Sequence, residues 1–378
     1  MEMTKRKKIV GTVELVTAAA VLIVAVVFAP AYKTAVGESD STVPQTEASA
    51  ETPSQQEADS ADAAENIMTT EPTTAPPEVG AYTVTPNYIV VTGDAAMEMY
   101  SVSKKKLTEY GGTVNALSAA VPEVKVFALL APTRMEYYGP EEYRTGSHSQ
   151  KRGIEIAYGA MNDNIVKVDA YDRLSRHTDE YLYFRTDHHW TARGAYRAYE
   201  AFCASAGLTC KPLSDHETGK LEGFVGSMYR YTQSEALKNN PDTVEVFYPT
   251  VDASGQFFSS PAMDDGKNLR IISTNINDPA SKYMAFIQGD KPLIKMTSNA
   301  AGGQKILLIK ESYGNAFAPF LLENYSEVYV LDPRQEGVKG MNLPQFLRDN
   351  GIGNVLFLNY MMAPSNSKYM DALNEMIH

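Results

Sequence analysis

The 378-residue chain has little cysteine and tryptophan, and it lacks several patterns that would assign a function at once. It contains no G-x-S-x-G segment, so it is not an α/β-hydrolase by motif. Its histidines form no H-x-x-H or H-E-x-x-H pattern of the kind found in zinc enzymes. The chain has no basic patch, no nucleic-acid reader motif and no internal repeat. The sequence therefore gives no indication of nucleic-acid binding or of a repeat architecture.

Cysteine is limited to two residues, Cys203 and Cys210. Neither has a neighbouring His or Cys that would indicate a redox or metal-binding role. In an exported protein the two could form one disulfide, and two buried thiols are the alternative. The sequence leaves both possibilities open.

The N-terminal thirty residues predict a membrane anchor. Four basic residues at 5–8 precede a mostly apolar run at 9–29, which only Glu14 interrupts. This length approaches the roughly 20 residues needed to span a bilayer, and the basic cluster favours a cytoplasmic N-terminus. Residues 27–31 match a signal-peptidase site poorly. We therefore expect a cytoplasmic basic tail (1–8) and an uncleaved signal anchor (9–30) in a single-pass membrane protein whose remaining chain is extracellular.

Residues 31–80 predict an extended linker. The stretch 37–79 is rich in Ser, Thr, Ala, Pro and Glu, and it has no aromatic residue, Lys or Arg. It carries most of the acidity behind the formal net charge of −12. Such a segment cannot bury enough apolar surface to fold, so we expect it to stay disordered and to hold residues 81–378 away from the membrane.

From residue 81 onward, short apolar runs alternate with helical patterns. This alternation predicts an α/β domain with a mostly parallel sheet, helices on both faces, and functional sites at the C-terminal ends of the strands. Residues 211–300 interrupt the alternation with turn signals and aromatic-rich runs, which predicts an antiparallel β-rich insertion. The predicted strands are 88–91, 124–130, 165–168, 306–309, 328–331 and 355–358. The predicted helices are 95–110, part of 141–163, 191–206, 316–323, 343–350 and 368–377.

An acid, two imidazoles and the only tryptophan of the chain are consecutive at residues 187–190. Thr191 is predicted to cap the helix that follows, which places Asp187 and His189 on its entry loop, where side chains are positioned yet reachable. The carboxylate and the imidazoles could instead bind zinc. Adjacent residues in extended backbone point to opposite sides, which disfavours one ion taking both His188 and His189.

A candidate nucleophile, Ser312, lies far downstream. The apolar run 305–309 predicts a buried parallel strand, and 316–323 predicts a helix. A serine at a strand-to-helix turn lies where free helix N–H groups can stabilise a developing oxyanion. The simpler alternative is that Ser312 only caps the helix, as many serines do.

Together these two segments resemble the signature of the DHHW protein family, SGNH-hydrolase-like relatives of the enzymes that O-acetylate bacterial exopolysaccharides such as alginate. In that family an apolar strand leads into K-[DE]-S-Y, and residues 310–315 fit this pattern. The resemblance covers residues 88–360 and implies an SGNH-like fold. It also implies that Ser312 is the nucleophile, His189 the general base, and Asp187 the residue that orients His189.

Two further segments resemble family elements: residues 223–229 an F-x-G-S-x-Y element, and residues 286–292 a G-N-x-P turn. Asp290 stands where the family has Asn, and an ionised Asp cannot donate a hydrogen bond to substrate or oxyanion, although the backbone N–H of Gly289 could. For Arg334, an ordinary salt bridge is the alternative to a place in the pocket wall. The predicted oxyanion or substrate-binding residues are Tyr313, Asn315, Gly289, His188, Arg185 and Arg334.

The resemblance implies an enzyme that transfers acyl groups, through an acyl-Ser intermediate, to a cell-envelope or secreted polysaccharide, and the predicted anchor makes it a membrane-anchored extracellular one. It implies O-acetylation without a cofactor or metal, and a polytopic membrane acyltransferase as the partner that supplies acetyl groups. The alternatives are a carbohydrate acetylesterase of the same fold and a non-catalytic glycan-binding or scaffold protein of the envelope. The presence of all three triad candidates favours an enzyme.

Overall fold

The computed structural model describes residues 80–300 and 302–378. The predicted cytoplasmic tail, signal anchor and nearly all of the predicted linker (1–79) lie outside these residues. Among the described residues, no helix combines the length and apolar character needed to cross a membrane.

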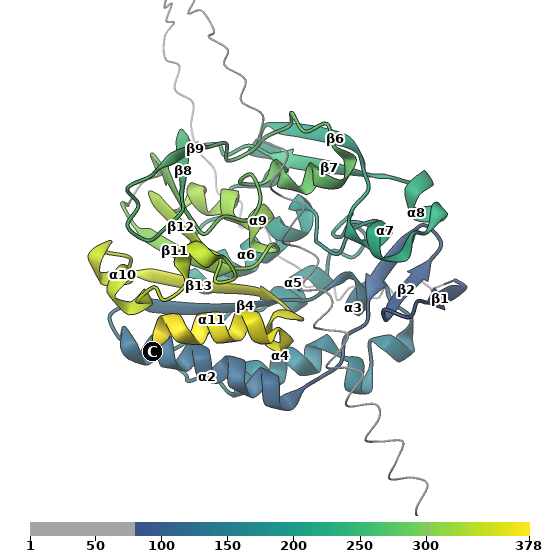
Figure 1. Ribbon diagram of the computed structural model, residues 1–378, viewed down its shortest axis with the longest axis horizontal. Coiled ribbons are helices and arrows are strands. Elements are labelled where there is room, and N and C mark those ends of the chain that lie inside the picture. Colours follow the sequence, from purple (N-terminus) through teal and green to yellow (C-terminus); the bar gives the residue numbers. More distant parts are fainter. Residues whose placement is uncertain (1–79, 301) are drawn as a thin grey trace, which may run out of the picture. The chain divides into compact units, whose positions relative to one another are not determined.

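The described residues contain one large mixed sheet of eight strands, in the order β5-β4-β13-β11-β12-β10-β8-β9 (Figure 1). The five strands from β5 to β12 pair in parallel, and β10, β8 and β9 continue the sheet in antiparallel pairs. The parallel strands are β5 (Val166–Lys167), β4 (Lys125–Ala131), β13 (Asn354–Tyr360), β11 (Lys305–Lys310) and β12 (Glu327–Leu331). The antiparallel edge consists of β10 (Leu293–Ser298), β8 (Ala253–Phe258) and β9 (Lys267–Leu269).

Helices cover both faces of this sheet, because its central strands are apolar on both sides. In β11, Ile306 and Leu308 contribute to one buried cluster, and Leu307 and Ile309 to the other. Figure 1 shows α2 and α11 on one side of β4 and β13, and α6 and α9 on the other. The first face carries α2 (Lys104–Ala120), α4 (Gln150–Gly159), α10 (Leu343–Asp349) and α11 (Ser367–Ile377). The second carries α5 (Ala170–Ser175), α6 (Ala192–Ala206), α9 (Gly314–Phe317) and the 3-10 helix η5 (Ala318–Glu323).

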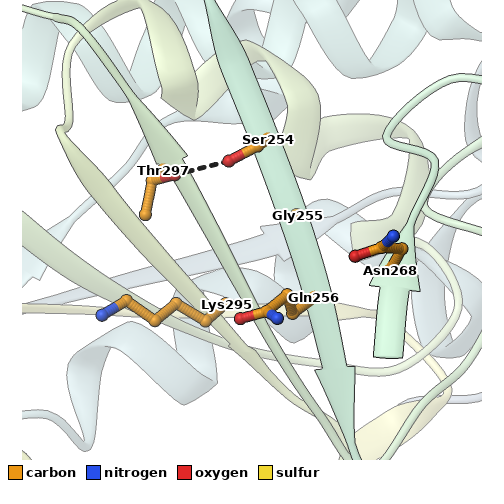
Figure 2. Close-up of a pocket in the computed structure, with 6 residues that line it drawn as sticks. All are labelled: Ser254, Gly255, Gln256, Asn268, Lys295 and Thr297. Atoms are coloured by element: carbon orange, nitrogen blue, oxygen red, sulfur yellow. Dashed lines mark hydrogen bonds between the residues drawn. The ribbon is translucent and has the colours of Figure 1, made fainter. Parts of the chain in front are cut away.

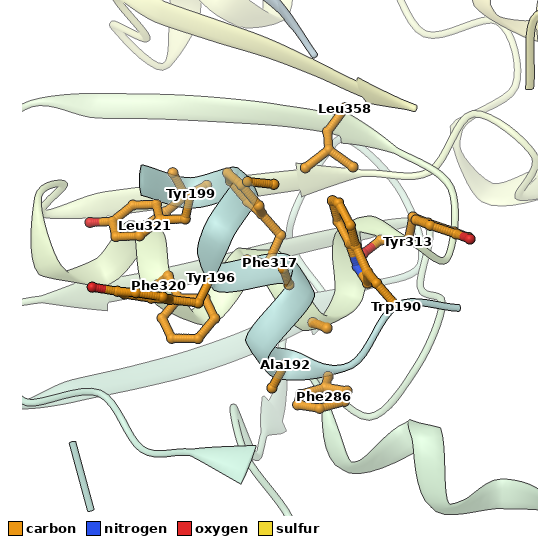
Figure 3. Close-up of a cluster of buried hydrophobic side chains, with 14 of the residues drawn as sticks. Trp190, Ala192, Tyr196, Tyr199, Phe286, Tyr313, Phe317, Phe320, Leu321 and Leu358 are labelled. Atoms are coloured by element: carbon orange, nitrogen blue, oxygen red, sulfur yellow. The ribbon is translucent and has the colours of Figure 1, made fainter. Parts of the chain in front are cut away.

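Helix α6 ends where the sequence predicts. The side chain of Thr191 accepts a hydrogen bond from the N–H of Gly194, and Gly207 closes the helix in the left-handed conformation. Trp190, just before the helix, is fully buried in an aromatic cluster with Tyr313 and its neighbours (Figure 3). Its indole N–H donates to the carbonyl of Tyr313 at 2.9 Å, so the tryptophan joins the loop before α6 to the turn after β11.

Residues 211–300 contain the antiparallel pairs predicted there, but these strands belong to two different sheets. Strand β6 (Thr218–Phe224) pairs with β7 (Asp242–Phe247). The helices α7 (Ser227–Thr232) and α8 (Glu235–Asn239) form the connection between these two strands in the sequence. Strands β8, β9 and β10 instead extend the main sheet, because β10 pairs along its length with β12. The short helices η3 (Leu213–Asp215) and η4 (Pro279–Ala285) complete this stretch.

The predicted helix 95–110 is wrong over its first part. Residues 95–98 form strand β3 (Ala95–Glu98) in an antiparallel sheet with β1 (Tyr82–Val84) and β2 (Ile89–Thr92). Gly93, at a φ of +54°, permits the tight turn between β2 and β3, and the side chain of Ser103 then caps α2 by accepting from Lys106. The remaining elements are α3 (Arg134–Tyr138), η1 (Glu141–Tyr143), η2 (Gly146–His148), η6 (Glu336–Val338) and η7 (Ala363–Ser365).

The two cysteines are free thiols in the structure. Cys203 is buried on α6, and the Cys210 Sγ lies 3.8 Å from the carbonyl oxygen of Tyr199.

Candidate active site

Three of the predicted site residues form a continuous line of hydrogen bonds. Ser312 follows β11, and its Oγ lies 2.7 Å from His189 Nε2. On the other side of the ring, His189 Nδ1 lies 2.6 Å from Asp187 Oδ1. Since a carboxylate only accepts, the neutral ring donates from Nδ1 to Asp187 and accepts the Ser312 hydroxyl proton at Nε2. This is the geometry by which an imidazole activates a serine as a nucleophile.

Asp187 is buried and tightly held. Its Oδ1 also accepts from the N–H of His189 at 3.0 Å, and its Oδ2 accepts from the N–H of Ser227 at 2.8 Å. Burial alone would raise the pKa of Asp187, but the two adjacent imidazoles and these hydrogen bonds hold it well below the usual range. Gly226 packs directly against the carboxylate, since a Cβ at this position would lie 2.3 Å from Asp187 Oδ2. Asp187 is therefore ionised and fixed in position.

The ring of His189 is covered on both faces. The Tyr283 ring stacks on it with centroids 3.8 Å apart and an interplanar angle of 9°. The His188 ring lies at the same centroid distance, tilted by 37°. Two rings this close cannot share one face of an imidazole, so they flank it. The Tyr283 hydroxyl also donates to the carbonyl of Ser312 at 3.1 Å, so one side chain contacts both His189 and Ser312.

His188 is held by Ser227 and stays uncharged at neutral pH. Its Nδ1 lies 2.6 Å from Ser227 Oγ. Burial and, to a lesser extent, the neighbouring His189 lower the pKa of His188 to about 4. A neutral His188 does not repel the positive charge that His189 acquires when it takes a proton.

The backbone N–H groups of two predicted oxyanion residues already have acceptors within the protein. The N–H of Tyr313 donates to Glu311 Oε2, and that of Gly289 donates to the carbonyl of Phe286. The N–H of Ser312 itself has no acceptor among the described residues, so it is available to a ligand at the nucleophile. A backbone N–H in this position can stabilise the negative oxygen of a tetrahedral intermediate.

Asp290 is the centre of a charged network beside the nucleophile turn. Its Oδ1 accepts from Lys310 Nζ at 2.7 Å and from Asn315 Nδ2 at 2.9 Å, and its Oδ2 accepts from Arg334 at 2.6 Å. Burial opposes ionisation, but Lys310 and Arg334 hold the pKa of Asp290 well below its usual range. Arg334 also pairs with Asp332. The side-chain donors of Asn315 and Arg334 therefore hold Asp290 in place, which is a structural role.

Arg185 does not join the triad, because its side chain pairs with Asp94 and Asp242. Asp242 also accepts from the N–H groups of Arg185 and Thr186, which fixes the backbone just before Asp187. Arg185 therefore supports the loop that carries the triad residues.

Glu311 is a buried acid that the sequence did not single out. Its two oxygens accept from the backbone N–H groups of Tyr313 and Tyr360, at 3.0 and 2.9 Å, which ties the nucleophile turn to the end of β13. Burial raises the pKa of Glu311 to about 7, against the lowering effect of Arg334 and of the two backbone donors.

The three residues that could bind a metal ion lie close together, but they are already hydrogen-bonded to other side chains. The potential ligand atoms of Asp187, His188 and His189 lie within 4.8 Å of one another. Their converging atoms are already engaged, since His189 bonds to Asp187 and His188 bonds to Ser227. A metal ion at this place would have to break the hydrogen bonds that connect Asp187, His189 and Ser312.

A hollow of about 300 Å³ lies over the antiparallel edge of the main sheet, away from these residues (Figure 2). Polar side chains line it, and the hydroxyls of Ser254 and Thr297 are hydrogen-bonded across it at 2.9 Å. Its walls come from β8, β9 and β10, and none of the three triad residues lines it.

Comparisons with known proteins identify the family. The sequence model for DHHW proteins matches residues 61–331. A crystal structure of a DHHW family protein from Eubacterium siraeum is 30% identical, with a TM-score of 0.71, covering 79% of this chain and 98% of that one. The chain belongs to the DHHW family.

A Bacillus cereus PatB1 structure with a sulfonyl adduct shares the fold. The identity is 15%, the TM-score is 0.62, and the alignment covers 76% of this chain and 99% of that one. No curated protein sequence matches this chain.

Several residues around the triad escaped the sequence analysis. Ser227 lies inside the segment 223–229, whose family resemblance carried no role, and Tyr283 lies in a 3-10 helix without a motif. The proximity of Ser227 and Tyr283 to His188 and His189 depends on tertiary packing, which no local pattern records.

Proposed function

We propose that this protein is a serine acyl-transfer enzyme that O-acetylates a polysaccharide. The observation that carries the proposal is the unbroken line of hydrogen bonds from Asp187 through His189 to Ser312, at 2.6 and 2.7 Å. The acetyl group and the polysaccharide acceptor rest on the resemblance of the DHHW family to the exopolysaccharide O-acetyltransferases.

The reaction proceeds in two halves. In the first, Ser312 Oγ bonds to the acyl carbon while its proton moves to His189 Nε2, and Asp187 stabilises the imidazolium. The N–H of Ser312 stabilises the tetrahedral oxyanion. The bond to the leaving group then breaks, and the leaving group takes the proton from His189. The product of this half is acetyl-Ser312.

In the second half, an acceptor hydroxyl gives its proton to His189 and its oxygen bonds to the acetyl carbon. The bond to Ser312 Oγ breaks, and the proton returns from His189 to Ser312. A sugar hydroxyl as acceptor makes the enzyme a transferase, and water makes it an esterase. The same triad supports either reaction, so the acetylesterase is the second candidate.

The proposed enzyme is anchored by residues 9–30, with its domain outside the cell. The basic cluster at 5–8 and the apolar run at 9–29 support this topology. An anchored domain is suited to receive acetyl groups at the membrane face, from a polytopic acyltransferase as its partner.

Cleavage of p-nitrophenyl acetate tests the serine mechanism. Ser312→Ala and His189→Ala should each lower kcat by about 10⁵-fold or more, and the double variant should be little worse, because the residues act as one unit. Asp187→Ala should retain somewhat more activity. Ser205→Ala, on the far part of α6, is the matched control. Incubation with the ester should leave an acetyl group on the Ser312 peptide, detected by mass spectrometry.

Two outcomes would contradict this mechanism. Undiminished cleavage by Ser312→Ala would exclude Ser312 as the nucleophile. Activity that disappears with a chelator and returns only with zinc would favour the metal alternative. Transfer of acetyl groups to glycan rather than to water would distinguish the transferase from the esterase.

A further inference from the structure

The carboxylate of Asp187 lies beside two imidazole rings that are both able to bond to it. Its Oδ1 is 2.6 Å from His189 Nδ1 and 3.8 Å from His188 Nδ1. The second distance exceeds an ordinary hydrogen bond by only about 1 Å. A small movement of the His188 ring would therefore bring it into competition with His189 for the same oxygen.

This oxygen cannot serve both rings. Asp187 Oδ1 already accepts from the backbone N–H of His189 at 3.0 Å, in addition to the ring nitrogen of the same residue. A carboxylate oxygen has two lone pairs, so a further donor must displace one of these hydrogen bonds. The two bonds together orient His189 with its Nε2 toward Ser312, 2.7 Å from the hydroxyl oxygen. If His188 displaced one of them, His189 would lose that orientation.

Ser227 holds the competing nitrogen. Its Oγ lies 2.6 Å from His188 Nδ1 and accepts from the backbone N–H of His188 at 3.3 Å. The hydroxyl proton of Ser227 has no other acceptor among the residues that the structure describes, so Ser227 donates it to His188 Nδ1. The neutral His188 ring then carries its own proton at Nε2. Its Nδ1 has no proton to donate to Asp187.

We infer that the Ser227 hydroxyl is a positioning group that reserves Asp187 for His189, and so decides which of two adjacent histidines is the base. The inference rests on the proposed acyl-transfer function. Ser227 acts on both partners of the competition, because its backbone N–H also donates to Asp187 Oδ2 at 2.8 Å. One residue therefore fixes the carboxylate and keeps the wrong imidazole away from it.

The segment around Ser227 is fastened to the loop that carries the two histidines. The N–H of Gly226 donates to Thr186 Oγ1 at 3.1 Å, and the N–H of Met228 donates to the Thr186 carbonyl at 2.9 Å. Ser227 itself is buried. These backbone contacts do not involve the Ser227 hydroxyl, so replacing the serine by alanine removes the hydroxyl and leaves the segment in place.

The tautomers of the two rings test the inference directly, in the full-length protein with isotope-labelled histidine. The ring nitrogen chemical shifts at neutral pH should show the proton of His188 at Nε2 and that of His189 at Nδ1. His188→Phe assigns the His188 signals by their loss. Ser227→Ala should move the His188 proton to Nδ1, from which it can donate to Asp187. An unchanged His188 tautomer in Ser227→Ala, or a wild-type His188 protonated at Nδ1, would overturn the inference.

Recovery of activity by a second substitution tests the consequence for the reaction. Ser227→Ala should lower kcat for p-nitrophenyl acetate about 10- to 100-fold, because a shift of about 1 Å within an active site can cost about 10²-fold. His188→Phe keeps a ring against His189 but offers no N–H, so it removes the competitor. Added to Ser227→Ala, it should raise kcat by about fivefold or more, a coupling of the size found between residues in contact.

Ser234→Ala is the matched control, because Ser234 begins the neighbouring helix α8 and its side chain makes no capping hydrogen bond. It should keep the wild-type kcat. All rates are compared at a temperature at which circular dichroism shows every variant folded, so that loss of folded protein does not enter the comparison.

The outcomes separate a positioning serine from a structural one. If Ser227 only supported the fold, the double variant would be as slow as Ser227→Ala or slower, which would overturn the inference. If His188 itself acted on the substrate, His188→Phe alone would be as slow as Ser227→Ala, and the inference would be wrong as well. The tautomers are measured without a substrate. A Ser312→Ala variant that remains active would therefore refute the proposed function and leave the assigned tautomers unaffected.

Discussion

Replacement of Gly226 by alanine should disable the triad without touching any of its three residues. Gly226 has a φ of −92° and a ψ of −154°, which any residue adopts, so the backbone itself tolerates alanine. The added Cβ, however, would lie 2.3 Å from Asp187 Oδ2 and 2.4 Å from Asp187 Cβ. Ordinary contact needs 3.4 Å or more, so the carboxylate or the loop must shift by about 1 Å.

The magnitude follows from what that shift breaks. The bonds at risk are those from Ser227 N–H and His189 Nδ1 to Asp187, at 2.8 and 2.6 Å. A misplacement of about 1 Å in an active site can cost about 10²-fold, and losing the function of the triad carboxylate costs about 10⁴-fold. We therefore expect Gly226→Ala to lower kcat by about 10²- to 10⁴-fold.

Stopped-flow release of p-nitrophenolate, with thermal unfolding in parallel, measures this effect. Gly112→Ala is the control, because Gly112 lies exposed in α2 with nothing within 4 Å of an added Cβ. It should keep full activity and gain about 0.5–1 kcal/mol of stability. The double variant Gly226→Ala/Asp187→Ala should be no slower than Asp187→Ala alone, because both act through one carboxylate. Wild-type kcat in Gly226→Ala, or fully additive losses in the double variant, would refute this reasoning.

Three further predictions concern the base, the buried acid and the topology. Tyr283→Phe keeps the stack on His189 but loses the bond to the Ser312 carbonyl, so kcat for p-nitrophenyl acetate should fall about 2- to 10-fold. Tyr283→Leu should lower kcat further, because it also removes the stack; equal rates in the two variants would contradict a role for the stacked ring. Since the pKa of Glu311 is raised to about 7, the folded state keeps a proton that the unfolded state loses, and the unfolding free energy should fall between about pH 4.5 and 7. Denaturation at several pH values should show a loss of up to about 3 kcal/mol in the wild type and no such loss in Glu311→Gln. The same dependence of unfolding free energy on pH in both proteins would contradict this prediction. Protease added to intact cells should release the domain by cleavage within residues 37–79, and protection of the domain would exclude an extracellular location.

Local signals were sufficient for the parallel core, whereas the roles expected of Ser312, His189 and Asp187 came from the resemblance to the DHHW family. The apolar runs at 306–309, 328–331 and 355–358 all lie within observed strands, because strands buried on both faces must be apolar throughout. The ends of these elements predicted only that Ser312 lies at a strand-to-helix turn and His189 on the loop that enters a helix. Parallel pairing brings the C-terminal ends of the strands to one edge, so two segments distant in sequence meet there.

Long-range packing decided what the sequence could not predict. The sequence predicts residues 293–298 as part of a separate insertion, because only the pairing of β10 with β12 makes this strand part of the main sheet. The sequence predicts a helix over 95–110, yet the turn at Gly93 returns residues 95–98 as strand β3. Tyr283 gave no signal at all, because its contact with His189 exists only in the folded protein.

The covering of His189 by His188 and Tyr283 constrains the timing of the reaction. An imidazole can turn about its Cβ–Cγ bond only if there is space above and below its plane, and both sides are filled. A proton taken from Ser312 therefore stays at Nε2 until a molecule arrives there to receive it. A ring that cannot turn cannot carry that proton to solvent, so the acyl-enzyme should retain it until the leaving group has accepted it. Product departure and proton transfer should thus be coupled in one step, visible as a solvent isotope effect on acylation.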